Sequence, residues 1–334
     1  MTSVIGIDIG GTGVRARLAQ VTPNGLLPGP AATNDTRTRI GIHGVDAHAT
    51  GRAVTGIIER LLTETGIRNV DAVAIGSTGL ALLGDNLRHA LPDTIMRTTG
   101  AQLIVLCSDV LTSYIGALGD RSGAVIAAGT GAVALGTDQH GHWQRSDGWG
   151  GLLGDIGGGA WIGRTAIDAA LRAHDGRPGG SRTLLTALNN RYGDPATLVA
   201  TAAASADRSG LLAAFASDVS ACAATDQIAA NILTEAGRHL ADTLLAALPP
   251  TAERTAAATG KVFQAPIVHD GFTRRLADRS PELRLIPAAG TVLDGAIHLA
   301  AAALHGTLPL GADLHLYTGS AAPASTTEPR KGSQ

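Results

Sequence analysis

The chain has 334 residues, of which 44% are hydrophobic and 16% are charged, so it can bury a sizeable core. Its formal net charge of -2 argues against nucleic acid or an anionic membrane surface as the main partner. With only Cys107 and Cys222, a disulfide framework and a cysteine metal cluster are both excluded. The 44 glycines exceed the ordinary usage of about 7%, so we expect many of them at sharp turns or beside a ligand.

Alternating apolar residues and short apolar runs predict strands, whereas apolar residues at helical spacing predict helices. Strands are expected at 4–9, 14–21, 70–75, 103–107, 124–128, 132–137, 255–259 and 283–286. Helices are expected at 45–65, 109–118, 160–173, 181–190, 211–223, 227–248, 267–277 and 291–305. Two similar openings, near residues 4 and 123, each place a Gly/Thr turn between two strands, which predicts two α/β lobes with a cleft between them.

The start of the chain carries neither the basic nor the apolar region of a signal peptide, and no apolar run approaches the ~18 residues of a membrane span. We therefore expect a cytoplasmic protein without a membrane partner. The chain has two lysines, Lys261 and Lys331, and Val262 stands where a Walker loop needs Ser or Thr after its lysine. A nucleotide site of the Walker type is thus excluded.

The first glycine-rich segment, Asp8-Ile9-Gly10-Gly11-Thr12-Gly13, lies between two predicted strands. Consecutive glycines let backbone N–H groups converge on an anion, and the Thr12 hydroxyl adds a donor. Asp8, at the end of the first strand, is placed to bind water on a Mg²⁺ ion that accompanies phosphates. A plain glycine-rich hairpin is the alternative.

The second glycine-rich segment, Gly129-Thr130-Gly131, has the spacing of a dinucleotide fingerprint. That fingerprint requires a helix after the glycines, whereas a strand and a turn follow here, so a Rossmann site is excluded. We interpret the segment as a second phosphate-binding hairpin, with a purely structural turn as the alternative.

Two further segments carry carboxylates. Asp109 follows a buried strand and opens a helix, where it could accept a proton from a substrate hydroxyl, although Ser108 and Asp109 equally suit a helix N-cap. The segment 147–155 combines Trp149 with two carboxylates and four glycines, which favours a polar ligand against an aromatic wall. A loop whose Trp149 merely packs is the alternative.

Taken in this order, the segments resemble the acetate and sugar kinase/Hsc70/actin superfamily, in its N-acetylglucosamine kinase branch, which is grouped with BadF/BadG/BcrA/BcrD-type ATPases. The resemblance covers residues 4–305 and includes 236–240 and 259–263 as the segments around adenosine. It implies an α/β fold of two ribonuclease-H-like lobes, the actin-like ATPase fold, with an interlobe cleft. The expected lobes are 1–118 and 119–310, the second with a helical insertion, followed by a partly disordered tail at 311–334.

The resemblance also implies a role for each matching residue. Asp109 would be the catalytic base, and Asp8 would hold Mg²⁺ through water. The residues implied in ATP binding are Gly10, Gly11, Thr12, Gly129, Thr130, Gly131, Gly237 and Gly260. Those implied in sugar binding are Asn34, Asp109, Gly148, Trp149, Gly150 and Asp155. The implied activity is ATP-dependent phosphorylation of the C6 hydroxyl of N-acetylglucosamine.

Other functions stay open at this point. They are a kinase for glucosamine or another hexosamine, an ATPase that drives electron transfer through an iron–sulfur cluster, and a non-catalytic sugar sensor. The sequence departs from the family pattern at Ala132, Ile156 and Thr259, where Ser, Glu and Gly are common. These departures bear on the choice of sugar more than on phosphoryl transfer. Related kinases are often dimers, which leaves a homodimer open.

Overall fold

The computed structural model describes residues 2–11, 13–35, 40–41, 44–80 and 84–319. The described chain divides into two compact units. Unit 1 comprises the residues up to Asp120, those from Gln139 to Trp143 and those from Ala289 onward. Unit 2 comprises Arg121–Asp138 and Gln144–Ala288.

Unit 1 is built on a six-stranded sheet in the order β13-β7-β6-β1-β2-β3. Its strands are β1 (Thr2–Gly10), β2 (Gly13–Thr22), β3 (Gly25–Asn34), β6 (Ala72–Ser77), β7 (Leu103–Ser108) and β13 (Leu314–Thr318). β1, β2 and β3 pair in antiparallel fashion, β6 and β7 continue parallel to β1, and β13 pairs antiparallel to β7. A two-stranded ribbon, β4 (Ile40–Gly41) with β5 (Gly44–Val45), lies outside this sheet.

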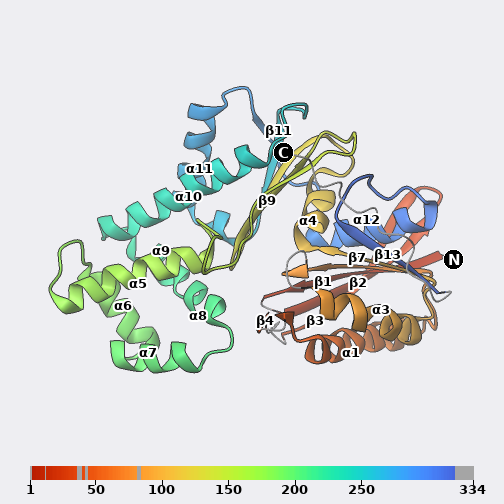
Figure 1. Ribbon diagram of the computed structural model, residues 1–334, viewed down its shortest axis with the longest axis horizontal. Coiled ribbons are helices and arrows are strands. Elements are labelled where there is room, and N and C mark those ends of the chain that lie inside the picture. The colour runs from red at the N-terminus through yellow and green to blue at the C-terminus, as the bar shows by residue number, and fades with distance from the viewer. Residues whose placement is uncertain (1, 12, 36–39, 42–43, 81–83, 320–334) are drawn as a thin grey trace, which may run out of the picture. The chain divides into compact units, whose positions relative to one another are not determined.

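Helices cover both faces of the unit 1 sheet (Figure 1). One face carries α1 (Ala47–Thr65) and α3 (Asp85–Thr99), and the other carries α4 (Asp109–Leu118) and α12 (Val292–His305). β1 is buried almost throughout, as expected for a central strand with helices on both sides. Gly6 lets α12 approach, because a Cβ at this position would lie 2.8 Å from the Ile297 backbone nitrogen.

Unit 2 repeats the same strand order on a five-stranded sheet, β10-β9-β8-β11-β12. The strands are β8 (Gly123–Ala128), β9 (Ala132–Thr137), β10 (Trp143–Asp147), β11 (Thr255–Thr259) and β12 (Arg284–Leu285). β8 and β9 are antiparallel, whereas β8, β11 and β12 are parallel. The predicted duplication of a strand–turn–strand opening is therefore confirmed, and each opening is the centre of its own ribonuclease-H-like sheet.

The rest of unit 2 is mainly helical. Its helices are α5 (Gly159–Asp175), α6 (Arg182–Tyr192), α7 (Pro195–Ala204), α8 (Arg208–Ala214), α9 (Ala216–Cys222), α10 (Gln227–Ala247), the short 3₁₀ helix η1 (Lys261–Gln264) and α11 (Pro266–Arg279). Aspartates 194, 207 and 226 cap α7, α8 and α10 by accepting backbone N–H groups of the first turn. α10 contributes the largest share of helix to the core, with nine buried residues against the sheet and α11.

The structure differs from the expected boundaries in several places. The elements β3, α3, β10, α7 and β13 were not predicted, and neither were the short elements β4, β5 and η1. The single helix expected at 211–223 is divided at Phe215 into α8 and α9. The segment 289–318 groups with unit 1 rather than with the preceding residues, because α12 packs on α4 and β1 and because β13 completes the unit 1 sheet. Of the expected tail, 314–318 is a strand, and 320–334 lies outside the described residues.

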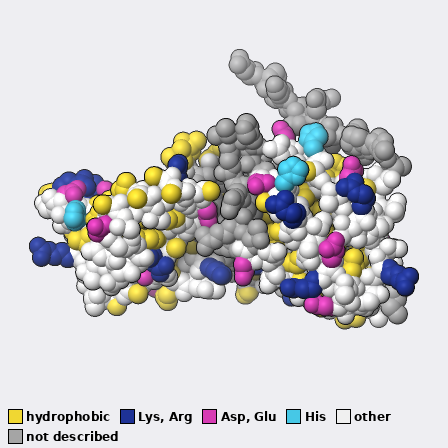
Figure 2. Space-filling model, turned by 90° about the horizontal axis from the view of Figure 1, so that it is seen from below, with side chains coloured by type: hydrophobic (Ala, Val, Ile, Leu, Met, Phe, Trp, Pro, Cys, Tyr) yellow, Lys and Arg dark blue, Asp and Glu magenta, His cyan; other side chains and the backbone are white. Residues whose placement is uncertain are grey.

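Charged side chains of both signs are interspersed over the face shown in Figure 2. Among the described residues, no helix combines the length and apolarity needed to cross a membrane.

Candidate functional site

Two carboxylates lie at the carboxyl edge of the unit 1 sheet. Asp8 is near the end of β1, and Asp109 directly follows β7 as the first residue of α4. β1, β6 and β7 are parallel, so their carboxyl ends meet at one edge, where ligands bind in open α/β sheets. The Thr78 N–H donates to the Ile9 carbonyl over 2.9 Å and ties the end of β6 to that of β1. The fold therefore brings Asp8 close enough to Asp109 for its charge to act on the Asp109 carboxyl group.

Asp8 is buried and paired with a cation. Only 5% of the residue is exposed, and the Arg15 Nη1 donates to the Asp8 Oδ2 over 2.9 Å. The two residues face each other in the β1–β2 register. Burial raises the pKa of Asp8, and the Arg15 guanidinium acts against this rise.

Asp109 has the more strongly perturbed carboxyl group. Burial raises the pKa of Asp109 to about 6, and the nearby negative charge of Asp8 adds to this rise. Hydrogen bonds from the Val110 backbone and the Thr78 side chain act in the opposite direction. Ser108, not Asp109, occupies the N-cap position, and its side chain makes no capping hydrogen bond. The carboxylate of Asp109 is thus not a helix cap, and it lies beside a second acid.

The first glycine hairpin lies at the same edge. Gly10 faces Gly13 across the tight turn between β1 and β2, which confirms the predicted strand–turn–strand. Asn34, predicted to contact sugar, ends β3 next to this turn, and a Cβ on Gly13 would lie 2.6 Å from the Asn34 carbonyl oxygen. Thr12 lies outside the described residues. Gly10, Gly11, Asn34, Asp8 and Asp109 therefore lie along the same edge of the unit 1 sheet.

The second glycine hairpin, Gly129–Gly131, joins β8 to β9 at the carboxyl end of β8. Gly260 ends β11 beside it, with a φ of 104°, and a Cβ there would lie 2.1 Å from the Ala128 carbonyl oxygen. The first turn of α5 is bonded to the hairpin: the Gly159 N–H donates to the Gly129 carbonyl over 2.8 Å. The Ala160 N–H donates likewise to the Thr130 carbonyl over 2.9 Å. Two hydrogen bonds from α5 and the close approach of Gly260 therefore hold the hairpin in place within unit 2.

The segment 147–155 forms a loop between β10 and α5. Trp149 is 61% exposed, and Leu152 and Leu153 are more exposed still. Asp155 is half-buried, and its carboxylate accepts the Gly150 N–H over 3.3 Å and a backbone hydrogen bond from Ala132. Burial and the charge of Asp147 raise the pKa of Asp155, and these hydrogen bonds oppose the rise. The packed-tryptophan alternative does not fit this exposed side chain.

Gly237, predicted near adenosine, lies where α10 crosses α11. A Cβ at this position would lie 2.2 Å from the Val268 carbonyl oxygen and 2.6 Å from the Phe272 nitrogen. The glycine thus permits close packing of the two helices. Its neighbour Ala236 has its carbonyl oxygen against Gly157, two residues after the 147–155 loop. A role in adenosine binding stays a prediction.

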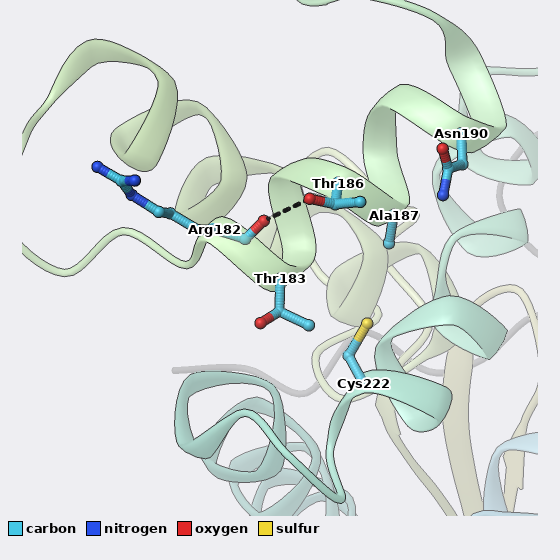
Figure 3. A pocket seen from close by; sticks show the side chains of 6 residues that line it. All are labelled: Arg182, Thr183, Thr186, Ala187, Asn190 and Cys222. Atoms are coloured by element: carbon cyan, nitrogen blue, oxygen red, sulfur yellow. Dashed lines mark hydrogen bonds between the residues drawn. The ribbon is translucent and has the colours of Figure 1, made fainter.

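A hollow of about 490 Å³ lies away from all predicted site residues, on the helical part of unit 2 (Figure 3). It is lined by Arg182, Thr183, Thr186, Ala187, Asn190 and Cys222. Within it the Thr186 hydroxyl donates to the Arg182 carbonyl over 3.1 Å, which is a bond inside α6. The other cysteine, Cys107, is buried in β7, where burial raises the pKa of its thiol.

Three residues at these two places were missed by sequence reasoning: Arg15, Thr78 and Arg145. Asp147 was noted only as one of the two carboxylates of the segment 147–155, without a role of its own. Arg15 could have been found, because a tight turn that pairs Gly10 with Gly13 must also pair Asp8 with Arg15. Thr78 carries no sequence signal of this kind, since its contact with Asp109 depends on the tertiary structure. The bonds of Arg145 to the Asp147 and Gly148 carbonyls are local, but they depend on the conformation of the loop.

The doubled sheet, with a glycine hairpin in each half and carboxylates at the strand ends, defines the actin-like ATPase fold of sugar kinases. The chain belongs to the BadF/BadG/BcrA/BcrD ATPase family, whose sequence model matches residues 5–293.

Two curated relatives match part of the chain. One is an N-acetylmuramic acid/N-acetylglucosamine kinase of Clostridium acetobutylicum, 28% identical over 194 residues, which are 55% of this chain and 58% of the relative. The other is an N-acetyl-D-glucosamine kinase of Dictyostelium discoideum, 33% identical over 108 residues, which are 32% of this chain and 30% of the relative. The chain thus matches 58% of the length of one relative and 30% of the other.

Solved structures match over nearly their whole length. A protein of Chromobacterium violaceum, provisionally named N-acetylglucosamine kinase, has a TM-score of 0.71 at 24% identity and covers 89% of this chain and 98% of its own. A protein of Porphyromonas gingivalis with the same provisional name has a TM-score of 0.67 at 17% identity, with the same coverage. A ROK family glucokinase from Streptomyces griseus, in complex with glucose and AMPPNP, has a TM-score of 0.58 at 20% identity and covers 90% and 99%. These likenesses confirm the fold.

Proposed function

We propose that the protein is an ATP-dependent amino-sugar kinase, with N-acetylglucosamine as its substrate and the C6 hydroxyl as the acceptor. The observation that carries this proposal is the pair of carboxylates at the carboxyl edge of the unit 1 sheet. Asp109 directly follows β7, is half-buried and lies next to the buried Asp8. The chain that carries this pair belongs to an ATPase family. Two partial relatives named as N-acetylglucosamine kinases support the same class of reaction.

In this proposal Asp109 is the general base. A pKa of about 6 leaves the Asp109 carboxylate ionised at neutral pH and makes it a stronger base than an ordinary aspartate. The hydrogen bonds from Thr78 and Val110 fix its direction. The carboxylate would orient the C6 hydroxyl for attack on the γ-phosphate and take up its proton. Phosphoryl transfer depends mainly on such positioning and on charge stabilisation.

The residues around Asp8 fit a magnesium ion. Mg²⁺ prefers carboxylate oxygens, water and substrate phosphates as ligands, and Asp8 offers a carboxylate next to a second one. The repulsion between these two acids, which contributes to the raised pKa of Asp109, is the kind of strain that a nearby cation relieves. Asp8 would hold the ion through water, and the ion would neutralise phosphate charge. The two glycine hairpins would hold the phosphates through backbone N–H groups.

The 147–155 loop favours an N-acetylated sugar over a free amino sugar. An ammonium group is best bound by a carboxylate with an available oxygen. Here both oxygens of Asp147 accept backbone N–H groups, and the Asp155 carboxylate accepts N–H groups from Gly150 and Ala132. The exposed indole of Trp149 offers instead an apolar surface that suits an acetyl group. This arrangement supports N-acetylglucosamine rather than glucosamine.

The test is an ATP-coupled assay of the purified full chain with N-acetylglucosamine, glucosamine, N-acetylmannosamine, N-acetylmuramic acid and glucose. We expect the highest kcat/KM with N-acetylglucosamine and formation of its 6-phosphate, identified by mass spectrometry and NMR. A higher kcat/KM with glucosamine would overturn the assignment of the N-acetyl group. Failure to phosphorylate any of the five sugars would overturn the kinase assignment itself.

A further inference from the structure

The 147–155 loop is closed by a single carboxylate. Asp147 ends β10 with a φ of 59°, and its Oδ1 accepts the Asp155 N–H over 2.7 Å. Its Oδ2 accepts the Ile156 N–H over 2.9 Å. Gly154 makes room for this carboxylate, because a Cβ there would lie 2.4 Å from the Asp147 Oδ1. The first residue of the loop is therefore bonded to the residues at its end, across its interior.

Arg145 bonds to the first two residues of the same loop through their backbone carbonyls. Its Nε donates to the Asp147 carbonyl over 3.1 Å, and its Nη2 donates to the Gly148 carbonyl over 2.5 Å. The guanidinium carbon lies 5.6 Å from the centre of the Trp149 ring, within the range of a cation–π contact. Trp149 is largely exposed, so this contact and the closed loop, rather than core packing, fix the direction of its indole.

The loop is also bonded to the second glycine hairpin. The Asp155 carboxylate accepts the Gly150 N–H within the loop and a backbone hydrogen bond from Ala132, the residue after Gly131. Asp147 fixes the backbone of Asp155, and Asp155 in turn reaches the hairpin. A chain of hydrogen bonds therefore runs from β10 through the loop to the hairpin, all within unit 2.

We propose that Asp147 and Arg145 are positioning residues that hold the 147–155 loop in its sugar-binding conformation and thereby set the affinity for sugar. This inference rests on the proposed function. Both Asp147 oxygens accept loop N–H groups, so Asp147 acts through the backbone of the loop and not on a ligand. A loop with positive φ at Asp147, Gly148, Gly150 and Asp155 has few other ways to stay ordered.

The test compares Asp147→Asn and Arg145→Gln with the wild type, in the full chain. Asp168→Asn is the matched control, because Asp168 is an exposed aspartate of unit 2 that pairs only with Arg172 in its own helix among the contacts described. Hydrogen exchange reports the opening of the Asp155 and Ile156 amides without any ligand. Calorimetry gives the Kd of N-acetylglucosamine, and the coupled assay gives kcat at saturating sugar.

We expect both variants to exchange the amides of residues 155 and 156 faster, to bind sugar about 10-fold more weakly and to keep kcat within about threefold, because positioning acts on binding. The control should match the wild type in all three measurements.

Unchanged amide exchange in Asp147→Asn would overturn the closing role, and faster exchange with unchanged sugar Kd would overturn the positioning role. If Asp147→Asn does not fold, Arg145→Gln decides by the same measurements. If the wild type binds no sugar at all, the proposed function falls and this role falls with it.

Discussion

The two carboxylate pairs of this protein are made stable in different ways. In unit 1, Asp8 and Asp109 face side-chain partners, an arginine and a threonine, together with the Val110 backbone. In unit 2, Asp147 and Asp155 accept backbone N–H groups of a single loop and the adjoining hairpin. Both oxygens of Asp147 accept loop N–H groups, whereas Asp109 lies beside the buried Asp8 and has its pKa raised to about 6. In the proposed function, the pair in unit 1 would therefore take part in the reaction, whereas Asp147 would hold the loop of unit 2 in place.

The physical basis of this difference is the balance of burial against hydrogen bonding. Burial is the largest cause of the raised pKa at both Asp109 and Asp155, and a neighbouring aspartate adds to it in each case. Only Asp109 is raised as far as about 6, which is close to the pH at which a base must work. Removing a member of each pair should therefore affect different steps of the reaction.

The largest effect is expected for Asp109→Ala. Loss of the proposed base should lower kcat by about 10²- to 10⁴-fold, the usual contribution of general base catalysis, while sugar binding persists. Steady-state kinetics with N-acetylglucosamine and calorimetric sugar binding check both parts. Near-normal turnover would remove the assignment of Asp109 as the base.

A smaller effect is expected on stability from Asp109→Asn. The native Asp109 has a raised pKa, so between about pH 4 and about pH 6 the native state binds a proton that the unfolded state has lost. The wild type therefore loses stability as the pH rises through this window, and at pH 7.5 it bears the full cost of the buried charge. Asn removes that cost, so we expect the variant to be about 3 kcal/mol more stable at pH 7.5.

Urea unfolding at pH 7.5 and pH 4.0 measures this difference. The gain of Asp109→Asn over the wild type should shrink toward zero at pH 4.0, where the native carboxyl is already protonated. A gain of the same size at both pH values would show that the charge of Asp109 is not its cause.

The smallest effect is expected at the second glycine hairpin. A Cβ on Gly131 would lie 2.4 Å from the Asp155 Oδ2, so Gly131→Ala must displace the carboxylate that joins loop and hairpin. The end of that side chain can move, so we expect a loss of about 1 kcal/mol in the free energy of unfolding. Gly129→Ala is the matched control for stability, because nothing lies within 4 Å of a Cβ there. Equal losses in the two variants would contradict the contact between Gly131 and Asp155.

Much of the fold could be predicted because it follows from local patterns. The two glycine turns, each between two alternating strands, locate the centres of both sheets. The buried strand before Asp109 locates the carboxyl edge of the unit 1 sheet, where the parallel strands end. β3 was missed because Pro28 and Pro30 suggest a loop, although prolines are tolerated in an edge strand. α3 was missed for a similar reason, since it contains Pro92.

The candidate site could be predicted in part. Asp8, Asp109 and the two hairpins follow from their places at strand ends, and Arg15 follows from hairpin register. The role of Thr78 could not be found in this way, because it depends on the tertiary structure that places Thr78 beside Asp109. The sequence shows Asp147 as a carboxylate of the segment 147–155, but not that it closes the loop. The assignment of 289–318 to unit 1 likewise depends on the packing of α12 against α4, which no local pattern encodes.

The most direct test measures kcat and the sugar Kd side by side in Asp109→Asn and Asp147→Asn. We predict opposite patterns: Asp109→Asn loses kcat by at least about 100-fold and binds sugar within about threefold of the wild type, whereas Asp147→Asn keeps kcat and loses affinity. The same pattern in both variants would contradict the division of chemistry and shape between the two carboxylate pairs.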